Sequence, residues 1–268
     1  MPDPAVQPAP SRADQLSAMS FLEHLEELRK RIIWSLVFIG LGFCACWWKA
    51  DYIYGYMQRP ILEVLRAHKM EATLIFTNPT DIFNLFLKVG FMAGVFVASP
   101  FVLYQVWAFI APGLYRHEKR YVMPFMASSV GLFLAGGLFA YKMVYPAALN
   151  FLIEYSQQAG AQFKPMITVG EYTDLFLTII IGMGIVFELP ILVFFLSLMG
   201  VITAGWMWRN LRYSILVIFI IAAIVTPTTD IMNMCIFAAP MVALYVLSIG
   251  IAYLVHPAQR KKRAEKNV

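Results

Sequence analysis

Glu188 is the most unusual acidic residue in this sequence of 268 residues, because it is the single charged residue between Leu175 and Ile202. A charge inside a membrane-spanning segment costs about 2.5–3.5 kcal/mol on insertion scales, so it needs a partner, a wet cavity or a proton. We therefore treat Glu188 as a candidate functional residue, with a hydrogen-bonded structural glutamate as the alternative. Pro190 follows two positions later and predicts a helix kink with a free carbonyl nearby.

A second group of acidic residues lies in SFLEHLEELRKRI, residues 20–32. Ser20 followed by Glu23 fits a capping box, which predicts a helix start. Apolar residues recur every three or four positions, so the helix has one apolar face. Glu27 precedes Arg31 by four residues, in the order that stabilises a helix. The simplest interpretation is an amphipathic helix with solvated charges leading into a membrane span, and a binding role for the acids is the alternative.

A third candidate segment is YQVWAFIAPGLYRHEKRY, residues 104–121. The Ala-Pro-Gly sequence at 111–113 predicts that a helix ends in a turn there. Glu118 then follows among Arg116, Lys119 and Arg120. A charge-balanced turn anchored at lipid headgroups is the simpler interpretation, and a site for a cationic ligand is the other.

Signatures of enzymes and of metal sites are missing from the sequence. It contains no HExxH, GxSxG or P-loop pattern. All four histidines lie outside the apolar segments, and the three cysteines have no metal-ligand or redox spacing. We therefore expect no catalytic residue, no metal and no cofactor.

The composition indicates which elements must position these residues. Hydrophobic residues make up 60% of the chain and charged residues 14%, whereas soluble domains carry about 45–50% and about 25%. This balance predicts an all-α integral membrane protein and nearly excludes a soluble enzyme. Six apolar segments stand out, at Ile32–Trp48, Val89–Tyr115, Tyr121–Tyr141, Leu175–Ile202, Tyr213–Val225 and Ile231–Val255.

The fifth segment is too short for an ordinary bilayer. Its 13 residues reach only about 20 Å as a helix, whereas the hydrocarbon core is about 30 Å thick. Only the residues TPTTD, 226–230, separate it from the sixth segment. The sequence therefore predicts a short hairpin of spans five and six, beside which either the bilayer thins locally or partner helices cover the ends.

The distribution of charge predicts the orientation of the six spans. The side that holds both termini carries 14 of the 21 basic residues and 7 of the 16 acidic residues, a balance of +7, and the other side has −2. The positive-inside rule then places both termini in the cytoplasm. The net charge of +5 is thus a topology signal, and we expect no nucleic-acid partner.

The remaining segments complete the predicted domain organisation. Residues 1–19 are rich in Pro, Ala and Gln and are expected to form a disordered cytoplasmic leader. Residues 20–255 form the six-span membrane domain with its N-terminal amphipathic helix, and residues 256–268 form a basic cytoplasmic tail. In the long loop after span one, apolar spacing at 52–65 predicts short helices on the outer interface.

Four motifs together resemble the TatC family, the multispanning receptor subunit of the twin-arginine protein translocase. They are FLEHLEELRKRI, SPFVLYQVWAFIAPGLYRHEKRY, GIVFELP, and ITAGWMWRNLRY followed by VTPTTD. The resemblance runs from about Ser20 to Val255, and motif order, spacing and span count agree. It implies a concave bundle of six transmembrane helices that acts as receptor and assembly platform for the export of folded proteins, driven by the proton-motive force.

The resemblance also implies functional positions. The acids that recognise the twin arginines of a signal peptide match Glu27 and Glu118. Arg29, Phe109 and Pro112 match supporting positions at the cytoplasmic site. Glu188 is expected in the wall of a lipid-facing groove, while Pro60 and Asp230 match structural positions on the periplasmic side. Adjacent guanidinium groups suit carboxylates because each presents a planar fork of donors.

Further implied partners are single-span subunits of the TatA and TatB types, other copies of this chain, and the bilayer of the cytoplasmic (inner) membrane. One departure from the family pattern lies in PMVALYVLSIG, where Val246 replaces a glutamate that the family often has. The residues by themselves leave a second hypothesis open, a proton-coupled secondary transporter of a small solute that uses Glu188. An intramembrane enzyme is disfavoured because a catalytic set is missing.

Overall fold

The computed structural model describes residues 12–110, 122–158, 166–225 and 231–255. Apart from one isolated bridge between Ile75 and Thr168, these residues form helices, turns and loops. The elements are α1 (Arg12–Trp47), α2 (Ala50–Met57), α3 (Arg59–Ala67), α4 (Thr80–Ile110), α5 (Val122–Phe139), the π-helical η3 (Ala140–Val144), α6 (Tyr145–Gln158), α7 (Val169–Val186), α8 (Leu189–Leu198), α9 (Ala204–Arg209), α10 (Leu211–Val225) and α11 (Ile231–Val255).

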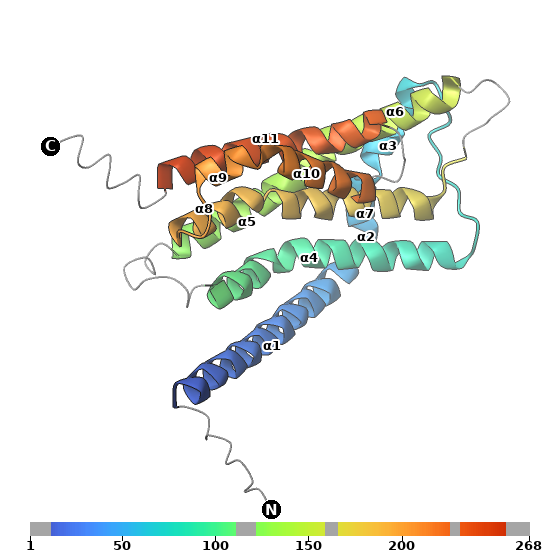
Figure 1. The fold of residues 1–268 in the computed structure, drawn as a ribbon. Coiled ribbons are helices and arrows are strands. Elements are labelled where there is room, and N and C mark those ends of the chain that lie inside the picture. Colours follow the sequence, from blue (N-terminus) through green and yellow to red (C-terminus); the bar gives the residue numbers. More distant parts are fainter. Residues whose placement is uncertain (1–11, 111–121, 159–165, 226–230, 256–268) are drawn as a thin grey trace, which may run out of the picture.

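The long helices confirm the predicted membrane fold. Among the described residues, five helical stretches are long and apolar enough to cross a membrane, and Leu211–Ile224 of α10 forms a shorter apolar helix. This shorter helix is the predicted fifth span, and it packs beside α11. Figure 1 shows that α1 begins and α11 ends at the same end of the molecule, as six crossings require. The TPTTD segment lies outside the described residues.

Helix α1 begins earlier than the capping box predicts. It starts at Arg12 rather than Ser20 and continues without interruption to Trp47. Residues 12–19 contain good helix formers such as Ala, Leu, Met and Gln, so the Ser-x-x-Glu pattern that follows them at 20–23 does not force a new start. Part of the predicted leader is thus helical, and residues 1–11 lie outside the described part of the chain. The amphipathic segment and the first span form one helix.

The third span is longer than predicted. Its helix passes through η3 into α6 and ends at Gln158 instead of near Tyr141. The helix continues past Lys142 and Pro146, because a π-helical turn absorbs the backbone bond that a proline cannot make. The extension carries α6 beyond the predicted span and provides a packing surface for α3.

The short helices predicted after span one are α2 and α3; the apolar residues of α3 pack against protein, whereas Tyr52 and Tyr56 of α2 are exposed. Ile61 and Leu65 are 0% and 1% exposed. Pro60 is buried in the first turn of α3, where a proline needs no hydrogen-bond partner. Tyr172 of α7 donates a hydrogen bond of 2.6 Å to the carbonyl of Met57. These contacts join the segment to the core.

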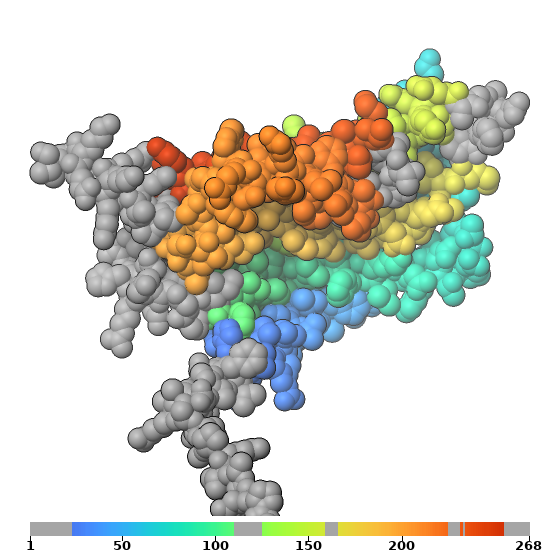
Figure 2. All heavy atoms as spheres, viewed as in Figure 1, coloured from blue at the N-terminus to red at the C-terminus, as the bar shows by residue number. Residues whose placement is uncertain are grey.

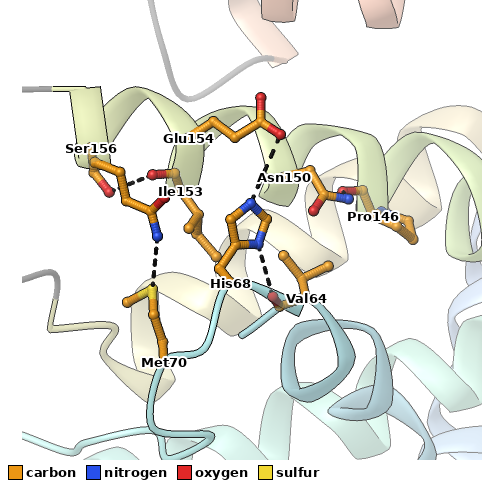
Figure 3. Close-up of polar contacts among 9 residues, drawn as sticks. Val64, His68, Met70, Pro146, Asn150, Ile153, Glu154 and Ser156 are labelled. Carbon is orange, nitrogen blue, oxygen red and sulfur yellow. Dashed lines mark hydrogen bonds and ion pairs between the residues drawn. The ribbon is translucent and has the colours of Figure 1, made fainter. Parts of the chain in front are cut away.

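A polar contact ties the end of α3 to α6 (Figure 3). His68 Nε2 lies 3.8 Å from Glu154 Oε1, and His68 Nδ1 lies 2.9 Å from the carbonyl oxygen of Val64. Nearby, Gln157 Nε2 lies 3.8 Å from the sulfur of Met70. The far end of the third span therefore holds the loop that leads to α4.

Helix α1 stands apart from the bundle and packs chiefly on α4 (Figure 1). Glycines allow this approach: a Cβ on Gly42 would lie 2.6 Å from the carbonyl oxygen of Gly94. Gly90, one turn before Gly94, faces Trp47 and Phe43. Small residues spaced four apart let helices approach closely in membranes. This contact fixes which residues of α1 meet the C-terminal half of α4.

Candidate functional site

Glu27 belongs to a polar cluster where α1 crosses the end of α4. Arg31 Nη2 donates to Glu27 Oε1 at 3.1 Å, and Arg31 Nη1 donates to Gln105 Oε1 at 2.9 Å. The predicted pair of residues four apart is thus present and gains a third member from α4. The side chains of Arg31 and Glu27 remain 29% and 31% exposed, whereas Gln105 is buried. The carboxylate is therefore partnered and still accessible.

Phe109 lies one turn beyond Gln105 and contacts the same helix. Its ring stacks on His24 of α1, with centroids 4.3 Å apart and an interplanar angle of 15°. The structure therefore brings two of the predicted site residues, Glu27 and Phe109, to one helix crossing. Arg29 is exposed on α1 nearby in sequence. Glu118, Pro112 and Asp230 lie outside the described residues.

Glu188 belongs to a second polar cluster, inside the bundle. Ser129 Oγ donates to Glu188 Oε2 at 2.5 Å, and Trp107 Nε1 donates to Ser129 Oγ at 2.9 Å. Ser129 is 0% exposed, and the ring of Trp107 stacks on Phe195 with centroids 4.3 Å apart. Glu188 Oε1 is buried and has no hydrogen-bond partner among the described residues. One carboxyl oxygen is thus held by a neutral donor, and the other is available for a further donor.

The predicted kink at Pro190 positions Glu188. Helix α7 ends at Val186, α8 begins at Leu189, and Pro190 occupies the first turn of α8. The carbonyl of Glu188 accepts the first backbone bonds of α8, from Ile191 and Leu192. Because a proline donates no backbone hydrogen bond, the helix is interrupted at this point in the middle of the span. The interruption places the glutamate at a helix boundary.

Helix α4 connects the two clusters. Gln105 and Phe109 are four residues apart and share the face that meets α1, whereas Trp107 lies between them and faces α5 and α8. The motif YQVWAF therefore places interacting side chains on two faces of one helix, as the helical period requires. Sequence reasoning missed Gln105, Trp107 and Ser129. The signal available was a run of hydrogen-bonding side chains at the end of an apolar span.

Comparison with known proteins identifies the family. A model of the family "Sec-independent protein translocase protein (TatC)" matches residues 23–240. The chain is 66% identical to the TatC protein of Koribacter versatilis (strain Ellin345) over 99% of this chain and 97% of that protein. It is 38% identical to TatC of Helicobacter pylori (strain ATCC 700392 / 26695) over 88% of each chain.

A solved structure, "Crystal Structure of Twin Arginine Translocase Receptor- TatC", matches with a TM-score of 0.76 and 35% identity, covering 87% of this chain and 99% of that chain. None of these matches supports the alternative of a small-solute transporter. The chain belongs to the TatC family and is a multi-span membrane component of a Sec-independent protein translocase.

Proposed function

We propose that this chain is the receptor of its translocase and binds the twin-arginine signal peptides of folded cargo proteins. The observation that carries the proposal is the accessible Glu27 carboxylate, presented beside Phe109 at the crossing of α1 and α4. The description of the similar crystal structure as a twin-arginine translocase receptor supports this assignment.

Glu27 supplies one of the two carboxylates that we propose bind the arginines of the signal peptide. Arg31 occupies Oε1, and a carboxylate can accept hydrogen bonds at both oxygens. A signal arginine thus approaches Oε2 and competes with Arg31 for the other oxygen. Gln105 holds Arg31 by its second terminal nitrogen, so Arg31 keeps a partner when the signal arginine displaces it. The pair is partly exposed, and such pairs are worth only about 0.2–1 kcal/mol, so displacement costs little.

Glu118 is the proposed partner of the second arginine. With two acids on separate elements, each guanidinium receives its own planar acceptor. Lysine has a point charge without the fork, so twin lysines bind more weakly. Arg29, Phe109 and Pro112 are the proposed supporting residues of this site.

Other predicted positions complete the proposal. Glu188 forms the polar wall of a groove that receives the apolar stretch of the signal, while Pro60 and Asp230 stabilise the periplasmic side.

The proposal also includes the location and the partners of the chain. Both termini lie in the cytoplasm, and the protein resides in the inner membrane. Single-span subunits of the TatA and TatB types and further copies of this chain assemble with it. The proton-motive force drives export, and the chain itself catalyses no reaction.

A pull-down with immobilised signal peptides tests the receptor proposal. The purified protein should bind a twin-arginine peptide at least tenfold better than its twin-lysine counterpart, about 1.4 kcal/mol. Changing both Glu27→Ala and Glu118→Ala should abolish this preference. Glu26→Ala, an exposed acid on the neighbouring position of α1, is the matched control and should keep it. Equal recovery of the two peptides by the wild type would refute the proposal.

A further inference from the structure

A groove between α9 and α11 has no role in the proposed receptor site. Its volume is about 720 Å³, and its lining includes Gly205, Trp208 and Arg209 of α9 and Val246, Gly250 and Tyr253 of α11. It lies over a small apolar core that includes Met207 and Ala252. Helix α9 and the C-terminal end of α11, which line it, lie at the same end of the molecule as the start of α1 (Figure 1). Helices α8 to α10, in orange, dominate the face shown in Figure 2.

The two glycines keep the groove open. A Cβ added to Gly205 or to Gly250 would meet no atom within 4 Å. Neither glycine therefore serves a close helix contact, in contrast to Gly42 and Gly94. Glycine weakens a helix by about 1 kcal/mol relative to alanine, so these positions give up helix stability and leave space for a ligand.

Val246 makes the wall of the groove apolar. It is 45% exposed and carries no polar group in its side chain. A carboxylate at this place would oppose an anionic ligand and would need its own partner in the membrane. Together with Ile249, the valine provides a surface for hydrocarbon.

Arg209 places a positive charge on the same groove. It is exposed, and no hydrogen bond or ion pair involves it among the described residues. Trp208 and Tyr253, both exposed, border the groove beside it. Tryptophan and tyrosine are enriched at the boundary between hydrocarbon and headgroups. The groove therefore joins an apolar wall to a cation and to two aromatic residues of the kind found at membrane interfaces.

We propose that this groove binds one anionic phospholipid of the surrounding bilayer. An acyl chain lies along the glycines and Val246, and the phosphate accepts hydrogen bonds from the Arg209 guanidinium, whose fork matches a phosphate. Charge complementarity at Arg209 favours an anionic headgroup over a zwitterionic one. A volume of 720 Å³ suits part of one small amphiphile, and the cation at its edge favours an anionic lipid as the occupant.

Native mass spectrometry of the purified full chain tests this site, with phosphatidylglycerol and phosphatidylcholine as probes. The wild type should retain one phosphatidylglycerol in preference to phosphatidylcholine. Arg209→Gln should weaken that retention about fivefold, the effect of one basic group near anionic headgroups. Gly250→Leu, whose Cβ would meet no atom within 4 Å, should fill part of the groove and weaken both lipids.

Matched controls separate the site from general effects. Gly131→Leu also meets open space but lies on α5, and Arg66→Gln removes an exposed charge from α3; both should behave as wild type. Unchanged lipid retention in Arg209→Gln and Gly250→Leu would overturn the proposal. It would also be overturned if Gly250→Leu reduced only the co-purification of single-span subunits, because the groove would then hold a protein helix.

Discussion

Glu27 and Glu188 lie on opposite sides of the C-terminal half of α4, and their partners differ in charge. Glu27 is partly exposed and pairs with a cation, Arg31. Glu188 is held inside the bundle by the hydroxyl of Ser129. An exposed pair exchanges partners at little cost, whereas a buried polar group loses much when its single partner is removed. The first arrangement suits a site that admits a charged ligand, and the second suits a fixed polar point in the membrane.

The largest expected effect is in the buried cluster. Ser129→Ala removes both the donor of Glu188 and the acceptor of Trp107, so it should destabilise the protein by about 1–3 kcal/mol. Denaturant unfolding in detergent measures this. Ser197→Ala is the control, because Ser197 is equally buried but its hydroxyl makes one bond among the described residues, 3.3 Å to the carbonyl of Ala252. It should cost about 0.6 kcal/mol, the average for such bonds in a membrane. Equal losses would contradict the special role of Ser129.

An intermediate effect is expected from Arg31→Gln in the exposed cluster. This change removes the cation that competes for Glu27, so a twin-arginine peptide should bind up to about fivefold more tightly, corresponding to 1 kcal/mol for an exposed pair. Fluorescence anisotropy of a labelled peptide measures the affinity. Lys30→Gln, an exposed neighbour without a contact to Glu27 among the described residues, should have a smaller effect. Weaker binding by Arg31→Gln would mean that Arg31 positions Glu27 instead of competing with the ligand.

The smallest effect is expected on the stability of Glu27→Gln. The side chain is 31% exposed and its ion pair is intrahelical, so the free energy of unfolding should change by less than about 0.5 kcal/mol. Its peptide affinity should nevertheless fall at least tenfold, because the acceptor charge is lost. Parallel unfolding and binding measurements separate these effects. A stability loss as large as that of Ser129→Ala would remove the distinction between the two clusters.

Much of the fold was predictable because hydrophobic length and charge placement act locally. The short fifth span and the interruption at Pro190 are both present in the structure, and the sixth span has the predicted bounds. The start of α1 and the end of the third span were predicted wrongly. In the first case strong helix formers overrode a local start signal, and in the second a π-helical turn continues the helix beyond the apolar segment.

The sequence alone determined that this is a six-span helical membrane protein with few acids, among them Glu27 and Glu188. These properties follow from residue types and their spacing along one chain. Only the tertiary structure decided that Arg31 bridges Glu27 to Gln105, that Ser129 joins Trp107 to Glu188, and that Val246 lines a groove with Arg209. Such contacts depend on which helix faces meet, and close approach at glycines such as Gly42 and Gly94 sets those faces.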